Sequence, residues 1–427
     1  MEILSDPTPD MLAMPRFDDG AIDMQELLRR LAEQVVNAVM DAEADQLCGG
    51  GANSRNGYRE RSLATCVGTL TLRIPKLRSG SFFPEDVLER YQRVDRALVA
   101  AVAEMYATGT STRKVQRVAE KMGVSRLSKD QVSAIASILD ADIEDLCGRP
   151  LGGSPVPYVW LDATYVKCRR GGGRVASTAV VTAIGCDAGG WRRVLGVDVV
   201  DTESYDSWLA FLRAIRSRGA AGVRLVVSDA HPGLVRALGE VFQGAAWQRC
   251  AVHLMRDCMR EAGSWQLRRR VGRIVSQVFR GRDAATVTAM YHAACDMLEG
   301  CCPRAAAVLE EAEPDALAYL DFPPAHWKRL RTNNVQERTN REIKRRSRVV
   351  QVFPSTGSLV RLAGAVMCEQ DEVWQESRYF SEVRMNELYD DGRTRGIDGR
   401  VDWARLEAEA RKMLESGLEL ADRVEAA

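Results

Sequence analysis

Apolar positions in the first third of the chain recur at helical spacing. Ala21–Gln46 carries leucine, isoleucine and valine three or four residues apart, which predicts one amphipathic helix. Val94–Leu146 continues the pattern and contains two shorter helices, Thr110–Gly123 and Lys129–Asp140, joined by a glycine-containing turn. Between the helical stretches, Asn53–Gly80 holds a short β-like run among arginines. A helix, a glycine turn and a serine-capped second helix, about 108–142, form the layout of a helix-turn-helix, although plain helical hairpins share it.

The pattern changes after a Gly- and Pro-rich linker at 149–155. Nearly continuous apolar runs, typical of strands buried on both faces, now alternate with helical spacing. The order is three strands, a helix, a strand, a helix and a strand, at Val156–Leu161, Val175–Ile184, Val194–Val200, Tyr205–Arg216, Val223–Val227, Gly233–Phe242 and Ala245–Cys250. Gly171–Gly173 is expected to form a hairpin between the first two strands. This order predicts a mixed five-stranded sheet of the RNase H-like kind.

The rest of the chain has no strand signal. His253 to about Leu320 is helical by its pattern, and the acidic tail is helical as well, with a loop at Asp390–Gly399. Between them, Lys328–Arg348 carries nine Lys or Arg against two acids and no Pro or Gly, which predicts a basic helix capped by Asn333 or Asn334. Its thin apolar seam consists of Val335, Thr339 and Ile343, and another face carries Glu337, Asn340, Arg341 and Lys344. Such a helix suits an anionic partner, although Glu337 could simply pair with Arg341.

Charge is segregated along a chain whose net charge is zero. Residues 1–54 carry eleven acids and three bases, whereas 249–282 carries nine arginines and two acids. Two basic blocks in a neutral chain indicate local contacts with a polyanion, although solvated helix faces give the same count. Eleven cysteines without a repeated spacing favour reduced thiols. With no basic, apolar leader and no apolar run of about 18 residues, we expect a cytoplasmic protein without membrane contact.

Three carboxylates stand out against this background. Asp162 and Asp229 each follow an apolar strand, and Glu337 lies in the basic helix. A carboxylate inside a strand would be costly to bury, so we expect both aspartates at strand ends, facing solvent or a cation. Together the three acids could hold two Mg²⁺ or Mn²⁺ ions for phosphoryl transfer. Taken singly, each has an ordinary structural explanation.

Four segments carry a resemblance to a known family. They are WLDATYVK, VVSDAHPGL, RCAVHLMRD and RTNNVQERTNREIKRRSRVVQVFP, and over about residues 53–380 they resemble the IS256 family of bacterial insertion-sequence transposases, related to the Mutator elements of plants. The resemblance implies an RNase H-like core with a DDE triad at Asp162, Asp229 and Glu337. It also implies an all-α insertion before the glutamate, for which the 107 residues between the last two acids leave room.

What the resemblance implies for function is DNA recombination. We expect a DDE transposase that binds terminal inverted repeats and catalyses metal-dependent cleavage and strand transfer, with two Mg²⁺ or Mn²⁺ ions per site. Its partners would be double-stranded repeat and target DNA, and a second copy in a synaptic complex at the bacterial nucleoid. Rival interpretations are a domesticated, catalytically silent regulator and a simple nuclease or junction resolvase.

Further residues are predicted near the site. The family's Cys-x-x-His signature is matched by Cys250 and His253. Zinc binding with His292 and Cys295 is a disfavoured alternative, because the second pair lies in a helical, Ala-rich stretch. His231 could contact the scissile phosphate or cap a helix. DNA contacts are predicted at Arg338, Asn340, Arg341, Lys344, Arg345 and Arg346 on the basic helix and at Arg113, Lys114 and Arg117 in the helix-turn-helix.

The predicted organisation has six parts. These are an acidic segment and helix at 1–52; a DNA-binding region at 53–150; the first part of the core at 155–253; an all-α insertion at 254–327; the core helix with the third acid at 328–354; and a helical tail at 355–427. The fold class is therefore α/β with large all-α parts.

Overall fold

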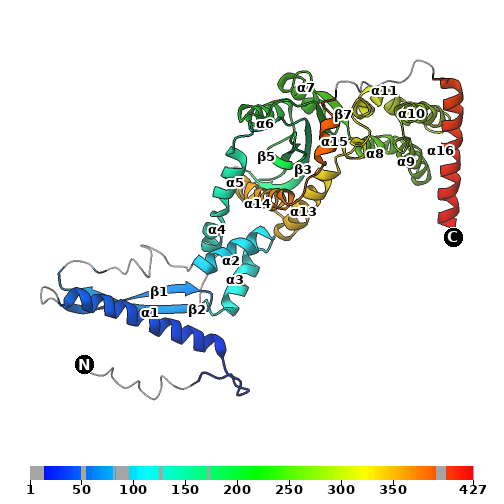
Figure 1. Ribbon diagram of the computed structural model, residues 1–427. Coiled ribbons are helices and arrows are strands. Elements are labelled where there is room, and N and C mark those ends of the chain that lie inside the picture. The colour runs from blue at the N-terminus through cyan, green and yellow to red at the C-terminus, as the bar shows by residue number, and fades with distance from the viewer. Residues whose placement is uncertain are drawn as a thin grey trace. The chain divides into compact units, whose positions relative to one another are not determined.

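The computed structural model describes residues 14–49, 54–79, 82, 96–124, 128–170, 174–390 and 401–426. The chain divides into two compact units, Met1–Asp140 and Ala141–Ala427 (Figure 1). The predicted hairpin at Gly171–Gly173 and the loop after Asp390 lie outside the described residues. Within the described ranges, no helix is both long and apolar enough to cross a membrane.

The first unit combines a long helix, a β-hairpin and short helices. Its elements are α1 (Met24–Cys48), β1 (Arg55–Thr65), β2 (Gly68–Leu77), α2 (Arg96–Ala107), α3 (Thr112–Lys121) and α4 (Lys129–Ala136). The single β-like run expected near residues 69–74 is in fact the second strand of an antiparallel hairpin, with Leu63 opposite Leu70. The first strand escaped prediction because most of its side chains are polar and exposed, so it lacks apolar alternation.

The second helix of the predicted helix-turn-helix is shorter than expected. It begins after Ser128, which forms a capping box with Gln131, and ends at Ala136 instead of Asp140. The Ser137 hydroxyl donates to the Ala134 carbonyl (2.6 Å), and a separate helix, α5 (Leu139–Gly148), follows. Val115 and Ala119 of α3 share a buried cluster with Val132 of α4. The two helices therefore pack together, while their assignment as a helix-turn-helix stays a prediction.

The second unit is built on the predicted mixed five-stranded sheet. Its strands are β3 (Tyr158–Arg169), β4 (Val175–Cys186), β5 (Arg192–Val200), β6 (Leu225–Ser228) and β7 (Ala246–Arg249). They lie in the order β5-β4-β3-β6-β7. The pairs β5–β4 and β4–β3 are antiparallel, whereas β6 and β7 run parallel to β3. The carboxyl end of β6 therefore points the same way as β3.

Helices cover both faces of this sheet, because each central strand is apolar on both sides. Val159 and Leu161 pack with α6 (Tyr205–Ser217) and α7 (Pro232–Val241) on one face. Tyr158 and Trp160 point to the other face and belong to the cluster that includes α13 (Asn334–Val350) and α14 (Thr356–Gln375). By strand alternation, residue 162 continues the Trp160 face and lies under α13.

A helical part follows β7, as the sequence pattern predicts. It consists of α8 (Ala251–Arg260), α9 (Trp265–Val278), α10 (Ala284–Glu299), α11 (Pro303–Ala316), the 3₁₀ turn η3 (Ala318–Asp321) and α12 (Trp327–Leu330). The tail supplies α15 (Glu382–Glu387) and α16 (Trp403–Ala426), and α16 packs beside α9 and α10 (Figure 1). Figure 1 shows these helices beyond the β7 edge of the sheet.

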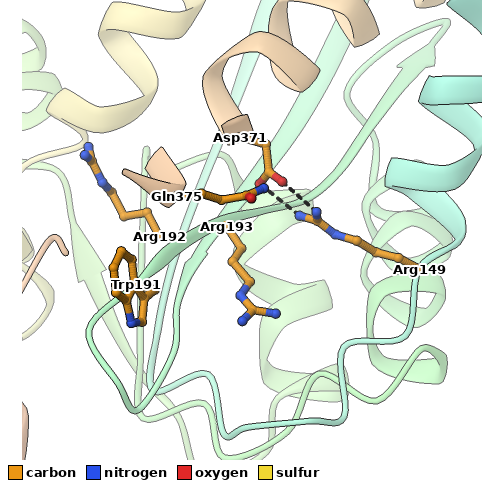
Figure 2. A pocket seen from close by; sticks show the side chains of 6 residues that line it. All are labelled: Arg149, Trp191, Arg192, Arg193, Asp371 and Gln375. Atoms are coloured by element: carbon orange, nitrogen blue, oxygen red, sulfur yellow. Dashed lines mark hydrogen bonds and ion pairs between the residues drawn. The ribbon is translucent and has the colours of Figure 1, made fainter. Parts of the chain in front are cut away.

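Buried polar bonds fasten the tail to the sheet. Asp371 of α14 accepts two bonds from Arg149 (2.5 and 2.9 Å), drawn in Figure 2, and one from the Val194 amide (2.7 Å). The Tyr158 hydroxyl donates to Nδ1 of His326 (2.6 Å), whose Nε2 donates to the Arg384 carbonyl (3.0 Å). Burial lowers the pKa of His326 to about 4, so this imidazole is neutral and can make both bonds.

Candidate active site

Asp162 lies in β3, and Asp229 directly follows β6, the neighbouring parallel strand. The last pair in the register between β3 and β6 is Trp160 with Val227, and each aspartate comes two residues after that pair. Because adjacent strands are about 4.8 Å apart, the two aspartates are neighbours at the point where the pairing of β3 with β6 ends. The Asp229 charge contributes to raising the pKa of Asp162, as expected for two close acids.

Asp162 does not end its strand, which corrects the sequence prediction. It is the fifth of twelve residues in β3, opposite Thr182, and only 7% of it is exposed. The strand continues because β4 stays paired with it as far as Arg169, although the pairing with β6 stops at Trp160. Burial raises the pKa of Asp162 to about 7, and Asp229 adds to the effect. A strand-interior carboxylate is thus retained at an energetic cost, which points to a functional role.

Helix α13 is fixed to β3 by three amide side chains on one of its faces. Asn333, its N-cap, donates to the Leu161 carbonyl (2.8 Å) instead of capping the helix. Gln336 donates to the Trp160 carbonyl (2.8 Å), and Asn340 donates through Nδ2 to Oδ2 of Asp162 (2.8 Å). Positions 333, 336 and 340 share a face at helical spacing. This attachment sets the position of Glu337 beside the aspartates.

Glu337 lines an open cleft of about 490 Å³ together with Asp162 and Asn340. Its carboxylate forms an ion pair with Arg256 of α8 (3.2 Å), and not with Arg341 one turn along its own helix. Within the described ranges, no three His, Cys, Asp or Glu side chains lie close enough to hold one metal ion. The structure therefore brings Asp162 and Glu337 to one cleft, with Glu337 bonded to an arginine.

The chemistry of this edge nevertheless suits a divalent cation. Carboxylate oxygens are the hard donors that Mg²⁺ and Mn²⁺ prefer. The raised pKa of Asp162 results from burial and from a second negative charge, and a cation between the two aspartates would offset both. The Oδ1 atom of Asn340 is buried and has no hydrogen-bond partner, so one more oxygen donor faces this region. Glu337 could join after leaving Arg256.

The signature pair and His231 have structural contacts. Cys250 is fully buried at the start of α8, where its sulfur accepts the Asn333 amide (3.2 Å). His253 lines the cleft, and burial lowers its pKa. His231 caps α7, its Nδ1 accepting the Leu234 amide (3.4 Å). The capping alternative for His231 is therefore confirmed.

The second pair of residues in the disfavoured zinc alternative, His292 and Cys295, has other contacts in the structure. His292 of α10 contacts Glu407 and Glu313, each at 3.0 Å. Cys295, on the same helix, is buried in the apolar core. These contacts place His292 in a carboxylate environment, which raises its pKa through the hydrogen bonds to Glu407 and Glu313.

Two of the residues predicted to contact DNA on α13, Arg346 and Asn340, are buried in the structure. The Arg346 side chain is 7% exposed and forms ion pairs with Glu342 (2.7 Å) and Glu369 (2.5 Å), so it faces the protein. Asn340 is buried against Asp162. Helical periodicity turns position 346 toward α14, which the sequence pattern could not reveal because arginine is ordinarily exposed. The exposed members of the predicted set are Arg338, Arg341, Lys344 and Arg345 on α13 and Arg113, Lys114 and Arg117 on α3.

Sequence reasoning missed two charged residues near the triad. Arg256, which holds Glu337, lies three residues after His253 on the same helix. The side chain of Glu203 is 7% exposed, and burial raises its pKa, with Asp229 adding to the shift. Glu203 follows β5, where an acid in a loop carries no signal of its own. Arg256 could have been suspected from its spacing to the signature pair.

A second hollow of about 340 Å³ lies elsewhere in this unit. Figure 2 shows its lining, in which Arg149 is bonded to Asp371 while Arg192 and Arg193 point apart. Arg192 pairs with Cys186, which pairs with Tyr158 at the start of β3, four residues before Asp162. This hollow is therefore separate from the triad. Its carboxylate, Asp371, is already paired with Arg149.

Comparisons with known proteins agree with the resemblance. A family model described as "Transposase, Mutator family" matches residues 10–377. The chain is 42% identical over 365 residues to the transposase for insertion sequence element IS1081 of Mycobacterium tuberculosis, covering 83% of this chain and 87% of that protein. It is 36% identical over 327 residues to the transposase for insertion sequence element IS256 in transposon Tn4001 of Staphylococcus aureus, covering 75% and 82%.

Among solved structures, the Drosophila P element transposase strand transfer complex aligns with 79% of this chain and 92% of that chain. The identity is 12% and the TM-score 0.27, which is too low to establish a shared fold. The family model and the sequence relatives are sufficient by themselves. This chain belongs to the Mutator family of transposases.

Proposed function

We propose that this protein is a DDE transposase that binds the terminal inverted repeats of an insertion sequence and catalyses DNA cleavage and strand transfer. The observation that supports the proposal is the position of Asp162 and Asp229, each two residues after the last pair between β3 and β6, together with a basic helix that places Glu337 in the same cleft as Asp162. Membership of a transposase family supports the same reaction class.

The three carboxylates would hold two Mg²⁺ or Mn²⁺ ions. Bound there, the ions supply charge stabilisation for the attacking and leaving oxygens of an in-line displacement at phosphorus. The chain's own contribution is positioning. Asn340 holds Oδ2 of Asp162, Gln336 ties α13 to β3, and Arg256 keeps Glu337 neutralised until that carboxylate is needed.

The rim of the cleft suits a phosphate backbone. Arg341, Lys344, Arg345 and Arg348 line it, and none of these four side chains is buried. Cationic side chains of this kind bind phosphates and position DNA without reading its sequence. The exposed Arg113, Lys114 and Arg117 of α3 would contribute a second basic surface.

The finer parts of the proposal follow the family resemblance. The five-stranded sheet would be an RNase H-like core, α8–α11 its all-α insertion, and α3–α4 a helix-turn-helix that recognises the element ends. The active form would contain at least two copies, since two ends must be joined, and would work on the bacterial nucleoid.

A strand-transfer assay tests the proposal. The full chain is incubated with Mg²⁺ or Mn²⁺ and a duplex that carries the terminal inverted repeat, beside a scrambled duplex. We expect metal-dependent nicking at the repeat end and joining to target DNA. Specific binding without cleavage would instead favour a catalytically silent regulator, and cleavage of both duplexes without joining would favour a simple nuclease.

A further inference from the structure

Helix α1 is apolar on two opposite faces. One face packs on the β-hairpin through Met40 and Ala44, which are fully buried against Leu70 and Leu72 of β2. The other face carries a row of apolar side chains at positions 24, 28, 31, 35, 39 and 42, all exposed in the structure. We call this row, Met24, Leu28, Leu31, Val35, Val39 and Ala42, the α1 stripe. Its five large members are 41–60% exposed.

Polar bonds fix the orientation of α1, so the stripe is held outward. Glu33 accepts the Thr71 amide (2.8 Å), and Asn37 accepts the Arg73 amide (2.7 Å) and donates to the Thr71 carbonyl (3.2 Å). These bonds occupy the open edge of β2, a place where an unpaired strand would otherwise invite aggregation. A rotation of the helix that buried the stripe would break all three.

The spacing of the stripe is that of a coiled-coil seam. Its successive intervals are four, three, four, four and three residues, close to the 3.5-residue average at which two helices stay in contact. At 1.5 Å per residue, the stripe is roughly 27 Å long. An exposed apolar surface of this kind on a protein marks an interaction site.

Charge indicates what the occupant is. The stripe contains no charged side chain, and its exposed flanking positions include Gln25 and Gln46. Most charges of α1 are engaged in ion pairs: Arg29 with Glu26 and Glu33, and Asp41 and Asp45 with Arg55 of the hairpin. A neutral apolar row does not suit nucleic acid, which requires Lys and Arg. Two copies of the stripe would not repel each other, because neither carries a charge.

The stripe is also complementary to itself in size. Around a twofold axis at Val35, Leu28 faces Ala42 and Leu31 faces Val39 of an antiparallel copy, so large side chains meet smaller ones. A twofold interface requires this kind of self-complementary patch. We propose that the α1 stripe is the surface through which two copies of this chain associate. The inference does not depend on the proposed DNA chemistry, because its test measures mass and not activity.

The experiment compares the full chain with Leu31→Glu/Val35→Glu by light scattering and sedimentation, without DNA. We expect the unaltered protein to be dimeric or larger at micromolar concentration and the double variant to lose at least half of that mass. The matched control is Val383→Glu on α15, which alters an apolar side chain that is 74% exposed outside the stripe. It should leave the mass unchanged. Circular dichroism establishes that each variant is folded.

Crosslinking keeps the test decisive if the double variant does not fold. Val35→Cys should give a covalent dimer under mild oxidation, well above the background of the native cysteines. A monomeric unaltered protein, or a double variant with unchanged mass, would overturn the proposal. The proposal would also be overturned if the unaltered protein were a monomer that associated only after deletion of residues 1–13, because those residues, and not a second copy, would then cover the stripe.

Discussion

Asp162 is the residue at which stability and function conflict most directly. Its folded pKa of about 7 lies above the ordinary value of 3.8, so the folded state binds the proton more tightly. This carboxyl therefore adds to the free energy of unfolding at low pH, and the added stability is lost as the pH rises from about 4 to 7. The sequence keeps an aspartate at position 162 although, without a bound cation, it lowers the stability of the folded protein near neutral pH.

Asp162→Asn should therefore stabilise the protein in chelator-treated buffer. A shift of about three pKa units corresponds to at most about 4 kcal/mol, and we expect a gain of roughly 1–4 kcal/mol at pH 8 that disappears near pH 4. Urea unfolding of both proteins at several pH values measures the difference. A gain that did not vary with pH would mean that the carboxyl is not strained by burial.

Asn340 is expected to act on Asp162 and not on DNA. Asn340→Leu removes the donor to Oδ2 of Asp162 and the unpartnered Oδ1, so apparent Mn²⁺ affinity should fall about tenfold, as for other residues that orient metal ligands. Titration calorimetry without DNA gives the value. Asn334→Leu, an exposed position at the start of the same helix, should leave the affinity unchanged, and equal losses in both variants would refute the positioning role.

Arg345 and Arg346 are adjacent but should behave differently. Arg346→Ala removes the cation of Glu369 and one of the two cations of Glu342, which still pairs with Arg345. It should destabilise the fold by about 2–3 kcal/mol, less than the 3–5 kcal/mol of a fully buried pair because both carboxylates are partly exposed. Arg345→Ala should change stability by under about 0.5 kcal/mol. Chemical unfolding separates the two, and similar values would contradict the inward position of Arg346.

At the scale of elements, some features of α13 could be predicted from the sequence and others could not. Its length, its basic character and its buried seam of Val335, Thr339 and Ile343 follow from spacing alone, and the structure confirms them. The inward positions of Asn340 and Arg346 could not be predicted, because a polar side chain faces the interior only where a hydrogen-bond or ion-pair partner lies opposite it. Those partners, Asp162 and Glu369, lie far away in the sequence.

The strands show the same division. The apolar runs predicted β3 to β7 and their order along the chain, since strands buried on both faces can be recognised without their partners. They did not predict that β3 continues past Asp162, because that extension depends on pairing with β4. The exposed strand β1 was missed for a related reason: its hairpin partner, and not its composition, makes it a strand.

The exposed face of α13 should govern the salt dependence of DNA binding. Removing one cation that binds a phosphate should flatten the slope of log K against log salt by about 0.9, so Arg341→Ala/Lys344→Ala should flatten it by about 1.8. Fluorescence anisotropy over a salt series measures the slope. Arg405→Ala/Arg411→Ala, which alters two exposed arginines of α16, is the control. An unchanged slope in the α13 variant would show that this face does not bind phosphate.

In the whole molecule, the central feature is the cleft lined by β3, α8 and α13, with Asp229 directly after the neighbouring strand β6. Asp162 and Asp229 come from the sheet, Glu337 from a helix more than a hundred residues later, and Arg256 from the helical part between them. If this cleft is the catalytic centre, every one of the three acids is needed for cleavage, and none is needed to bind the element ends.

The most direct measurement is metal-dependent cleavage of an inverted-repeat duplex by Asp162→Asn, Asp229→Asn and Glu337→Gln, each beside a gel shift. Removing one carboxylate at constant size should lower the cleavage rate at least about a hundredfold and leave binding within a few fold. Glu409→Gln, an exposed acid of α16 paired with Arg405, should cleave normally. Normal cleavage by any one of the three triad variants would contradict the proposed catalytic centre.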